Sequence, residues 1–163
     1  MAISYRDTYK SGCGYNHSDL GDELTNRLND AHGVFLTFTK RYHEIRVAAH
    51  DLDKRVKKEP SPFDEGDAHQ IYFQLFGLMY DEINAYQNKF LDKEVLVGWL
   101  TWQMYDYTGG EFKIGEVSYD NGWQWWLTTP AKHHQYTPML KKIFTCKDKE
   151  CVKDTVERQT AAD

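Results

Sequence analysis

The sequence lacks several features that would define broad classes of protein. No uncharged run approaches the roughly 20 apolar residues that a membrane-spanning helix needs. Basic charge is not in excess, since 20 Lys and Arg stand against 25 Asp and Glu, a net charge of -5. This balance argues against general nucleic-acid binding, which depends on neutralising phosphates. The first residues, MAISYRDTYKSG, have no apolar core, so we expect no signal peptide and a cytoplasmic location with reduced thiols.

Motifs that carry chemistry are also scarce. No phosphate-binding glycine loop is present, and no nucleophile has a recognisable partner spacing. Cys13 and His17 are four residues apart, and Cys146 and Cys151 are five apart. These four are weak candidates for a zinc set, because zinc ribbons use tighter Cys pairs. Free thiols are expected, and a Cys146–Cys151 disulfide is the alternative for an exported protein.

The seven histidines do not predict a metal site. His43 and His50 lie about two helical turns apart, or roughly 10 Å along a helix. Ligands of one ion lie about 2 Å from it, so the two cannot share one. We therefore predict no metal and no cofactor.

Apolar residues recur at alternating steps of four and three between residues 24 and 56. The series is Leu24, Leu28, Ala31, Phe35, Phe38, Tyr42, Ile45, Ala49, Leu52 and Val56. This heptad seam predicts one long helix, closed by Pro60 and Pro62. We expect the seam to pack on later helices of the same chain. Self-association through a coiled coil is the alternative.

A pair of apolar helices is predicted between residues 68 and 107, joined by a break at Lys89–Asp92. Residues 71–80 are apolar on nearly every side, which is typical of a helix enclosed by other elements. Asp92 suits the N-cap of the second helix, because its carboxylate can accept from free amides. Gly109-Gly110 can end that helix with left-handed backbone conformations.

Two adjacent acids, Asp81 and Glu82, fall inside the first helix of this pair. We expect one of them to be partly buried. A buried carboxyl group can serve as a general acid. We favour the alternative of an ion pair, for which Arg41 and Arg46 are candidate partners.

After residue 110 the pattern is weaker. Asp120-Asn121-Gly122 is either a hairpin turn or, as we prefer, the cap of a short Trp-rich helix. Thr137-Pro138 predicts the start of a last helix, over Met139 to Phe144. Residues 147–163 are charged, and we expect them to fray.

These elements predict an all-α fold. A long N-terminal helix packs against an antiparallel helix pair, and short Trp-rich helices follow. We divide the chain into a polar N-terminal arm (1–18), a single helical domain (19–146) and a charged C-terminal tail (147–163). A length of 163 residues fits one domain with one core.

The tryptophans are the most suggestive feature for function. All five fall between residues 99 and 126, and the simplest interpretation is that they pack a core. The alternative is an exposed aromatic face for a partner protein or a membrane interface, since such side chains suit half-wet surfaces. The candidate partner-binding residues are Trp102, Tyr119, Trp123, Trp125 and Trp126.

Three segments together resemble a known kind of protein. They are FQLFGLMYDEINAYQNKFLDKEVLVGWLTWQMYDY, YDNGWQWW and YTPMLKKIF, within residues 70–146. They resemble the helical domain of small, uncharacterised bacterial proteins, in which a long helix often follows an N-terminal membrane anchor. The matching positions are Glu82, Leu91-Asp92, Trp99 and Trp125-Trp126. The resemblance implies a helical fold, and this chain departs from the pattern by having no anchor. No activity is established for the family, so the resemblance implies no catalytic residue.

The absence of a catalytic set, the long seam and the aromatic candidates lead to one functional expectation. We predict a non-catalytic protein–protein interaction module, an accessory or structural subunit of a larger assembly. It would act through a protein partner or through self-association of its helices. The alternative is a metal-binding or ligand-sensing helical protein. A cytoplasmic location is expected, with peripheral association with a membrane complex as the alternative.

Overall fold

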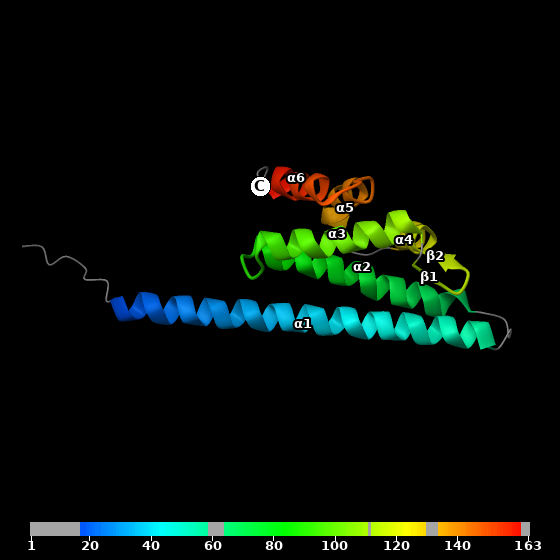
Figure 1. Ribbon diagram of the computed structural model, residues 1–163, viewed down its shortest axis with the longest axis horizontal. Helices are drawn as coiled ribbons and strands as arrows, with labels where there is room; N and C mark the ends of the chain where they lie inside the picture. The colour runs from blue at the N-terminus through cyan, green and yellow to red at the C-terminus, as the bar shows by residue number, and fades with distance from the viewer. Residues whose placement is uncertain (1–16, 59–63, 111, 130–133, 161–163) are drawn as a thin grey trace, which may run out of the picture.

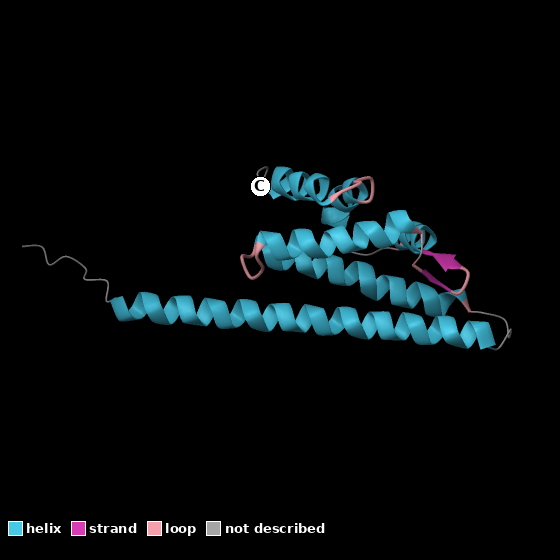
Figure 2. Ribbon diagram, viewed as in Figure 1, coloured by secondary structure: helices cyan, strands magenta, loops and turns pink. Residues whose placement is uncertain are grey.

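The computed structural model describes residues 17–58, 64–110, 112–129 and 134–160, and side chains from residue 31 onward except at residues 134 and 160. Figure 2 shows that this part of the chain is helical apart from one small hairpin. The predicted all-α class is confirmed. Most of the predicted N-terminal arm lies outside the described residues.

The helices form three layers (Figure 1). The first is α1, the second is α2 with α3, and the third is α5 with α6. Contacts join α1 to α2, α2 to α4, and α6 to both α3 and α5. In chain order the elements are α1 (His17–Lys58), α2 (Glu65–Gln87), α3 (Lys93–Gly109), β1 (Lys113–Ile114), β2 (Val117–Ser118), α4 (Tyr119–Thr128), the 3-10 helix η1 (His134–Tyr136), α5 (Thr137–Ile143) and α6 (Lys149–Thr160).

The heptad seam of α1 packs inside the chain over part of its length. Its buried members are Phe38, Ile45, Ala49 and Leu52. Beside the seam, the Arg41 guanidinium donates to the Asp81 carboxylate of α2 at 2.7 Å. The first turns of α1 extend past the other helices (Figure 1). The backbone of α1 therefore continues beyond the part of the helix that packs on α2.

The break between α2 and α3 lies where the sequence predicts it. Lys89 takes a left-handed conformation (φ 63°) and turns the chain. Asp92 is the N-cap of α3, although its side chain makes no capping hydrogen bond. Leu91 and Leu96 are both buried, as in a hydrophobic staple. Gly110 ends α3 in the left-handed region (φ 64°), as expected.

The Trp-rich helix is also present, but its cap differs from the predicted one. Ser118 is the N-cap of α4, and its hydroxyl accepts from the Asn121 amide at 3.1 Å. A hairpin does occur, one segment earlier, where β1 pairs with β2 around Gly115 (φ 59°). Only glycine fits at position 122, because an added Cβ would lie 2.4 Å from the Tyr72 ring. That close approach sets how α4 lies on α2.

The expectation of a frayed C-terminal tail is wrong for residues 149–160. They form α6, which packs on α3 and α5. Val152 and Val156 are fully buried and Thr155 nearly so. These three side chains have helical spacing and form one narrow inward stripe. The charged residues between them conceal this stripe in the sequence. The preceding helix, α5, starts at Thr137, one residue before the predicted first helical position.

No helix in the described ranges combines the length and apolarity needed to span a membrane. This finding agrees with the absence of a long apolar run in the sequence.

Candidate functional site

A groove of about 450 Å³ opens between α1, α2 and α3, and we call it the Glu82 groove. Helices α1 and α3 each contribute four of the lining residues, and α2 contributes Glu82. The lining residues are Phe38, Thr39, Tyr42, Arg46, Glu82, Trp99, Trp102, Gln103 and Asp106. Four of these side chains are aromatic, and the polar ones include one buried acid. A concave site with apolar walls and few polar groups is typical of ligand-binding pockets.

Glu82 is the chemically unusual residue of the groove. Its side chain is only 4% exposed, and its Oε2 atom has no hydrogen-bond partner among the described residues. Burial raises the pKa of Glu82 to about 8, and the nearby Asp81 charge acts in the same direction, while Arg41 opposes both. The carboxyl group is therefore largely protonated at neutral pH.

The expected ion pair for the two adjacent acids is formed by only one of them. Arg41 pairs with the exposed Asp81, not with Glu82. Arg46 pairs with Asp106 of α3 at 2.9 Å. The two candidate arginines thus pair with Asp81 and Asp106, and neither forms an ion pair with Glu82.

Arg46 is held at one edge of the groove by more than this ion pair. Its guanidinium lies 4.6 Å from the centroid of the Phe112 ring and 5.9 Å from that of Tyr42. Cation–π contacts of this kind add a modest attraction between a guanidinium and the rings. Together with Asp106, Arg46 forms a fixed charged edge.

The Gln103 side chain is held by a hydrogen bond from Tyr119, a residue that does not line the groove. Its side-chain oxygen accepts from the buried Tyr119 hydroxyl at 2.9 Å. Burial raises the pKa of Tyr119 well above its ordinary value, so this hydroxyl stays protonated and remains a donor.

The Trp99 side chain is also held by its neighbours, because its ring stacks on Phe35 at 5.5 Å and meets the edge of Phe38 at 6.0 Å. The groove is therefore largely preorganised.

The structure separates the five predicted partner-binding residues. Tyr119, Trp123 and Trp126 are buried, so these three cannot serve as a partner surface in this conformation. Trp125 is partly buried, and its ring stacks on His69 at 4.4 Å. Only Trp102 is broadly exposed, at 70%, and it lines the Glu82 groove.

The buried tryptophans belong to an aromatic core between α2, α4 and α5. The Phe76 ring lies 5.1 Å from Trp123 and 5.7 Å from Trp126. Trp123 also meets the edge of Phe144, again at 5.1 Å. Such tilted and edge-to-face pairs add to the stabilisation that burial of area provides. The simplest interpretation of the tryptophans, core packing, holds for these members.

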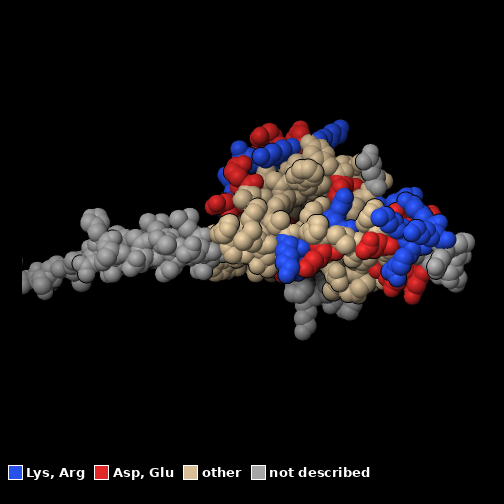
Figure 3. Space-filling view, turned by 60° about the horizontal axis from the view of Figure 1, so that its bottom comes forward, with Lys and Arg blue, Asp and Glu red and all other residues tan. Residues whose placement is uncertain are grey.

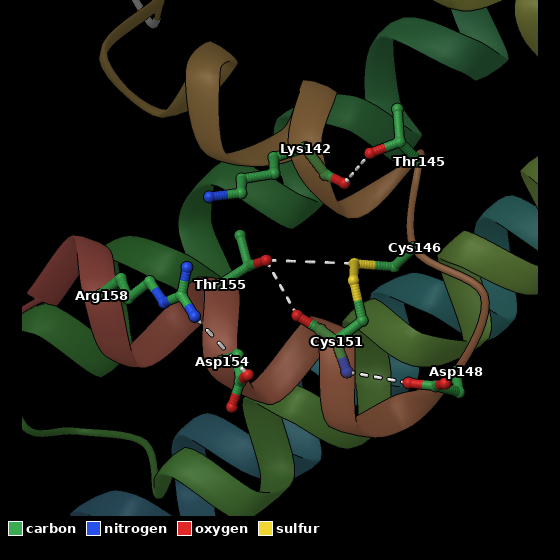
Figure 4. Close-up of a disulfide and its surroundings, with 8 residues drawn as sticks. All are labelled: Lys142, Thr145, Cys146, Asp148, Cys151, Asp154, Thr155 and Arg158. Carbon is green, nitrogen blue, oxygen red and sulfur yellow. Dashed lines mark hydrogen bonds and ion pairs between the residues drawn. A yellow bond between two sulfur atoms is a disulfide. The ribbon is translucent and has the colours of Figure 1, made fainter.

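The cysteines near the C-terminus form a disulfide, so free thiols, the default expectation, are wrong for this pair. Cys146 follows α5 and Cys151 lies in the first turn of α6 (Figure 4). The Thr155 hydroxyl lies 3.9 Å from the Cys146 sulfur and donates to the Cys151 carbonyl. The bond links α5 to α6.

The proposed zinc set is not assembled. Two of its four members, Cys146 and Cys151, are joined to each other, Cys13 lies outside the described residues, and the His17 side chain is not described. Within the described part of the chain, no group of three or more His, Cys, Asp or Glu side chains is arranged to hold a metal ion.

Fold and groove together define a helical protein with a partly apolar groove between α1, α2 and α3. Comparisons with protein families, curated proteins and solved structures find no match for this chain.

Sequence reasoning anticipated the buried acid but missed the groove. The signal available was the pair Asp81-Glu82 in an otherwise apolar helix. The groove combines that position with residues 17 or more positions away along the chain, on α1 and α3. No local pattern indicates that these residues share one opening.

Proposed function

We propose that this protein is a non-catalytic interaction module that receives an amphipathic helix of a partner protein on the first turns of α1. The observation that carries the proposal is that the apolar series of α1 changes from buried to exposed side chains toward its N-terminal end. Four of the seam residues from Phe38 onward are buried, whereas Phe35 is 37% exposed and its neighbour Leu36 is 52% exposed. A helix that leaves its own bundle with its apolar series unfinished is suited to pairing with another helix.

The series continues upstream in the sequence, which supports the same proposal. Leu24, Leu28 and Ala31 keep the heptad steps toward the start of α1. On the face in view, Figure 3 shows Lys and Arg gathered close to Asp and Glu, with tan surface between these clusters. We expect a partner helix to pack its apolar side against the upstream part of the series.

Charge indicates the kind of partner. Residues 17–30 contain the acids Asp19, Asp22, Glu23 and Asp30 but a single basic residue, Arg27. A second copy of this segment would bring like charges together, which disfavours self-association. A basic amphipathic helix would pair its apolar face with the seam and its cations with these acids. A protein partner of that chemistry would make this chain an accessory subunit.

The test compares two double variants of the full chain. Leu24→Asp with Leu28→Asp places two charges on the seam. Thr25→Asp with Asn29→Asp places two charges beside it and serves as the matched control. Affinity purification from native cells identifies a partner, and titration of that purified partner against each variant then measures binding. We expect the seam variant to bind at least about tenfold more weakly, because a buried interfacial charge is costly, and the control to bind nearly as the wild type does.

A partner that binds the seam variant and the wild type equally would contradict the proposal. Recovery of the protein alone in repeated purifications would do the same. Circular dichroism spectra of both variants check that α1 remains helical.

The location is a separate part of the proposal. The sequence predicts the cytoplasm, whereas the Cys146–Cys151 disulfide is of a kind that persists mainly in oxidising compartments. We favour an oxidising compartment on this ground. Rapid acid quenching of native cells, followed by alkylation, measures the oxidised fraction, and a fully reduced pair would restore the cytoplasmic prediction.

A further inference from the structure

We propose that the Glu82 groove binds a small organic amine in its protonated form, with the ammonium group at Glu82 and the apolar body between the aromatic walls. The inference does not rest on the docking of a partner helix, because every residue that lines the groove lies outside residues 17–36. The proposal assigns organic amines as the ligand class of the Glu82 groove, which aromatic and acidic residues line.

The first argument is the buried carboxyl oxygen of Glu82 that accepts no hydrogen bond from the described residues. Glu82 is 4% exposed, and Oε2 has no hydrogen bond within the described part of the protein. A buried acceptor without a partner costs stability, and such groups are uncommon in native structures. An N–H donor of a ligand in the groove would satisfy this atom.

The second argument is the nature of the walls. Trp99 and Trp102 of α3 line the groove together with Phe38 and Tyr42 of α1. Aromatic faces carry negative electrostatic potential and attract cations. Because Trp99 is already held by its stack on Phe35, little freedom is lost when a ligand packs on it. Aromatic walls around a carboxyl group favour an organic cation.

The protein's own cations do not take this place. Arg41 is paired with Asp81, and Arg46 is paired with Asp106 and lies over the Phe112 ring. An anionic ligand would instead face Glu82 and Asp106. The volume of about 450 Å³ falls in the range that holds small molecules. An amine with N–H groups is favoured over a quaternary ammonium ion, because only the N–H donates to Oε2.

Protonation of Glu82 couples this binding to pH. The charged or titratable groups around Glu82 are Arg41, Tyr42 and Arg46 on α1, Asp81 on α2, Asp106 on α3 and Tyr119 on α4. Burial is the largest effect on Glu82 and raises its pKa to about 8. An ammonium ion favours the carboxylate, so amine binding near neutral pH releases a proton.

The experiment uses three probes with one aromatic body and different head groups. They are 2-phenylethylamine, the neutral 2-phenylethanol and the anionic phenylacetate, titrated into the full chain by calorimetry. We expect only the amine to bind, and to bind about tenfold more tightly at pH 9 than at pH 7, where Glu82 must first lose its proton. Calorimetry at pH 7 in buffers of different ionisation enthalpy measures the proton released.

Variants identify the site. Glu82→Gln keeps the shape of the side chain and should abolish the pH dependence and weaken amine binding at pH 9 at least tenfold. Trp102→Ala removes an exposed aromatic side chain that lines the groove, and it should also weaken amine binding. Glu44→Gln changes an exposed acid of α1 that does not line the groove, and it is the matched control with affinity near that of the wild type.

Each contrary outcome overturns the proposal. These outcomes are no amine binding at millimolar concentration, equal binding of the alcohol or of phenylacetate, or undiminished amine binding to Glu82→Gln. Thermal melts confirm that each variant is folded before titration.

Discussion

At the scale of single residues, burial of Glu82 makes one specific contribution to the pH dependence of stability. Its pKa is raised from 4.5 to about 8 on folding, mainly by burial. Between these two values the folded chain holds a proton that the unfolded chain has released. Stability is therefore independent of Glu82 at lower pH and falls as pH rises through this window.

Glu82→Gln removes that dependence, which gives the first prediction. The free energy of unfolding of the wild type should fall relative to that of the variant by about 1 kcal/mol per pH unit between roughly pH 5 and 8. Urea unfolding at several pH values measures the difference. Glu44→Gln changes an exposed acid of α1, so it is the control and should retain the slope of the wild type. Parallel pH profiles for the wild type and Glu82→Gln would contradict this account of Glu82.

Two tryptophans illustrate how differently one residue type can be used. Trp126 is 2% exposed and packs against Phe76, whereas Trp102 is 70% exposed. Trp126→Ala should lower the free energy of unfolding by about 3–5 kcal/mol, since it leaves a large cavity. Trp102→Ala should change it by less than about 0.5 kcal/mol, because it removes little buried area. Chemical denaturation of both variants measures this contrast, and equal costs would contradict it.

At the scale of elements, the contact between α4 and α2 depends on Gly122, which has no Cβ atom. A Cβ at position 122 would lie 2.4 Å from the Tyr72 ring, and this ring is held by the bond from its hydroxyl to the Val117 carbonyl at 3.0 Å. Gly122→Ala should therefore destabilise the fold by about 1–3 kcal/mol through overpacking.

Gly77 provides a matched control in the middle of α2. A Cβ at that position would meet nothing within 4 Å. Gly77→Ala should stabilise the fold by about 0.5–1 kcal/mol, because alanine loses less backbone entropy in a helix. Thermal melts of the two alanine variants should shift in opposite directions. Shifts of the same sign would show that α4 does not lie on Tyr72 as described.

The link between α5 and α6 gives a second prediction for the elements. The Cys146–Cys151 disulfide closes a short loop, so its expected contribution is roughly 2 kcal/mol. A reducing agent should lower the melting temperature of the wild type by several degrees. The Cys146→Ser, Cys151→Ser double variant should melt at the lower temperature with or without reductant. A wild-type melt that is insensitive to the reductant would contradict this contribution.

At the scale of the whole molecule, α1 is longer than the bundle that it packs against (Figure 1). The extending segment carries four acids and one arginine over residues 17–30. Like charge should oppose pairing of two copies of this segment, most strongly at low salt. We predict that the isolated chain sediments as a monomer at low ionic strength, as measured by sedimentation equilibrium. A stable dimer that Leu24→Asp with Leu28→Asp dissociates would make a second copy the partner.

Much of the helical architecture was predictable from the sequence, because the relevant signals are local. The heptad steps of α1, the apolar run of α2 and the glycine that ends α3 each act within a few residues. The C-terminal helix was missed, since its inward stripe of Val152, Thr155 and Val156 is narrow among charged neighbours. The burial of these three residues depends on α3 and α5, which pack against α6, and a local sequence pattern does not show that packing.

The sequence by itself determined the helical class, the break between α2 and α3 and the presence of an acid in an apolar helix. Only the tertiary structure decided which aromatic residues are buried, which acid is unpaired and that the cysteines near the C-terminus are joined. The reason is physical. Helix formation depends on spacing and caps within a segment, whereas burial, pKa and groove shape depend on side chains that distant segments bring together. Glu82 lies in a groove because α1 and α3 flank α2 there.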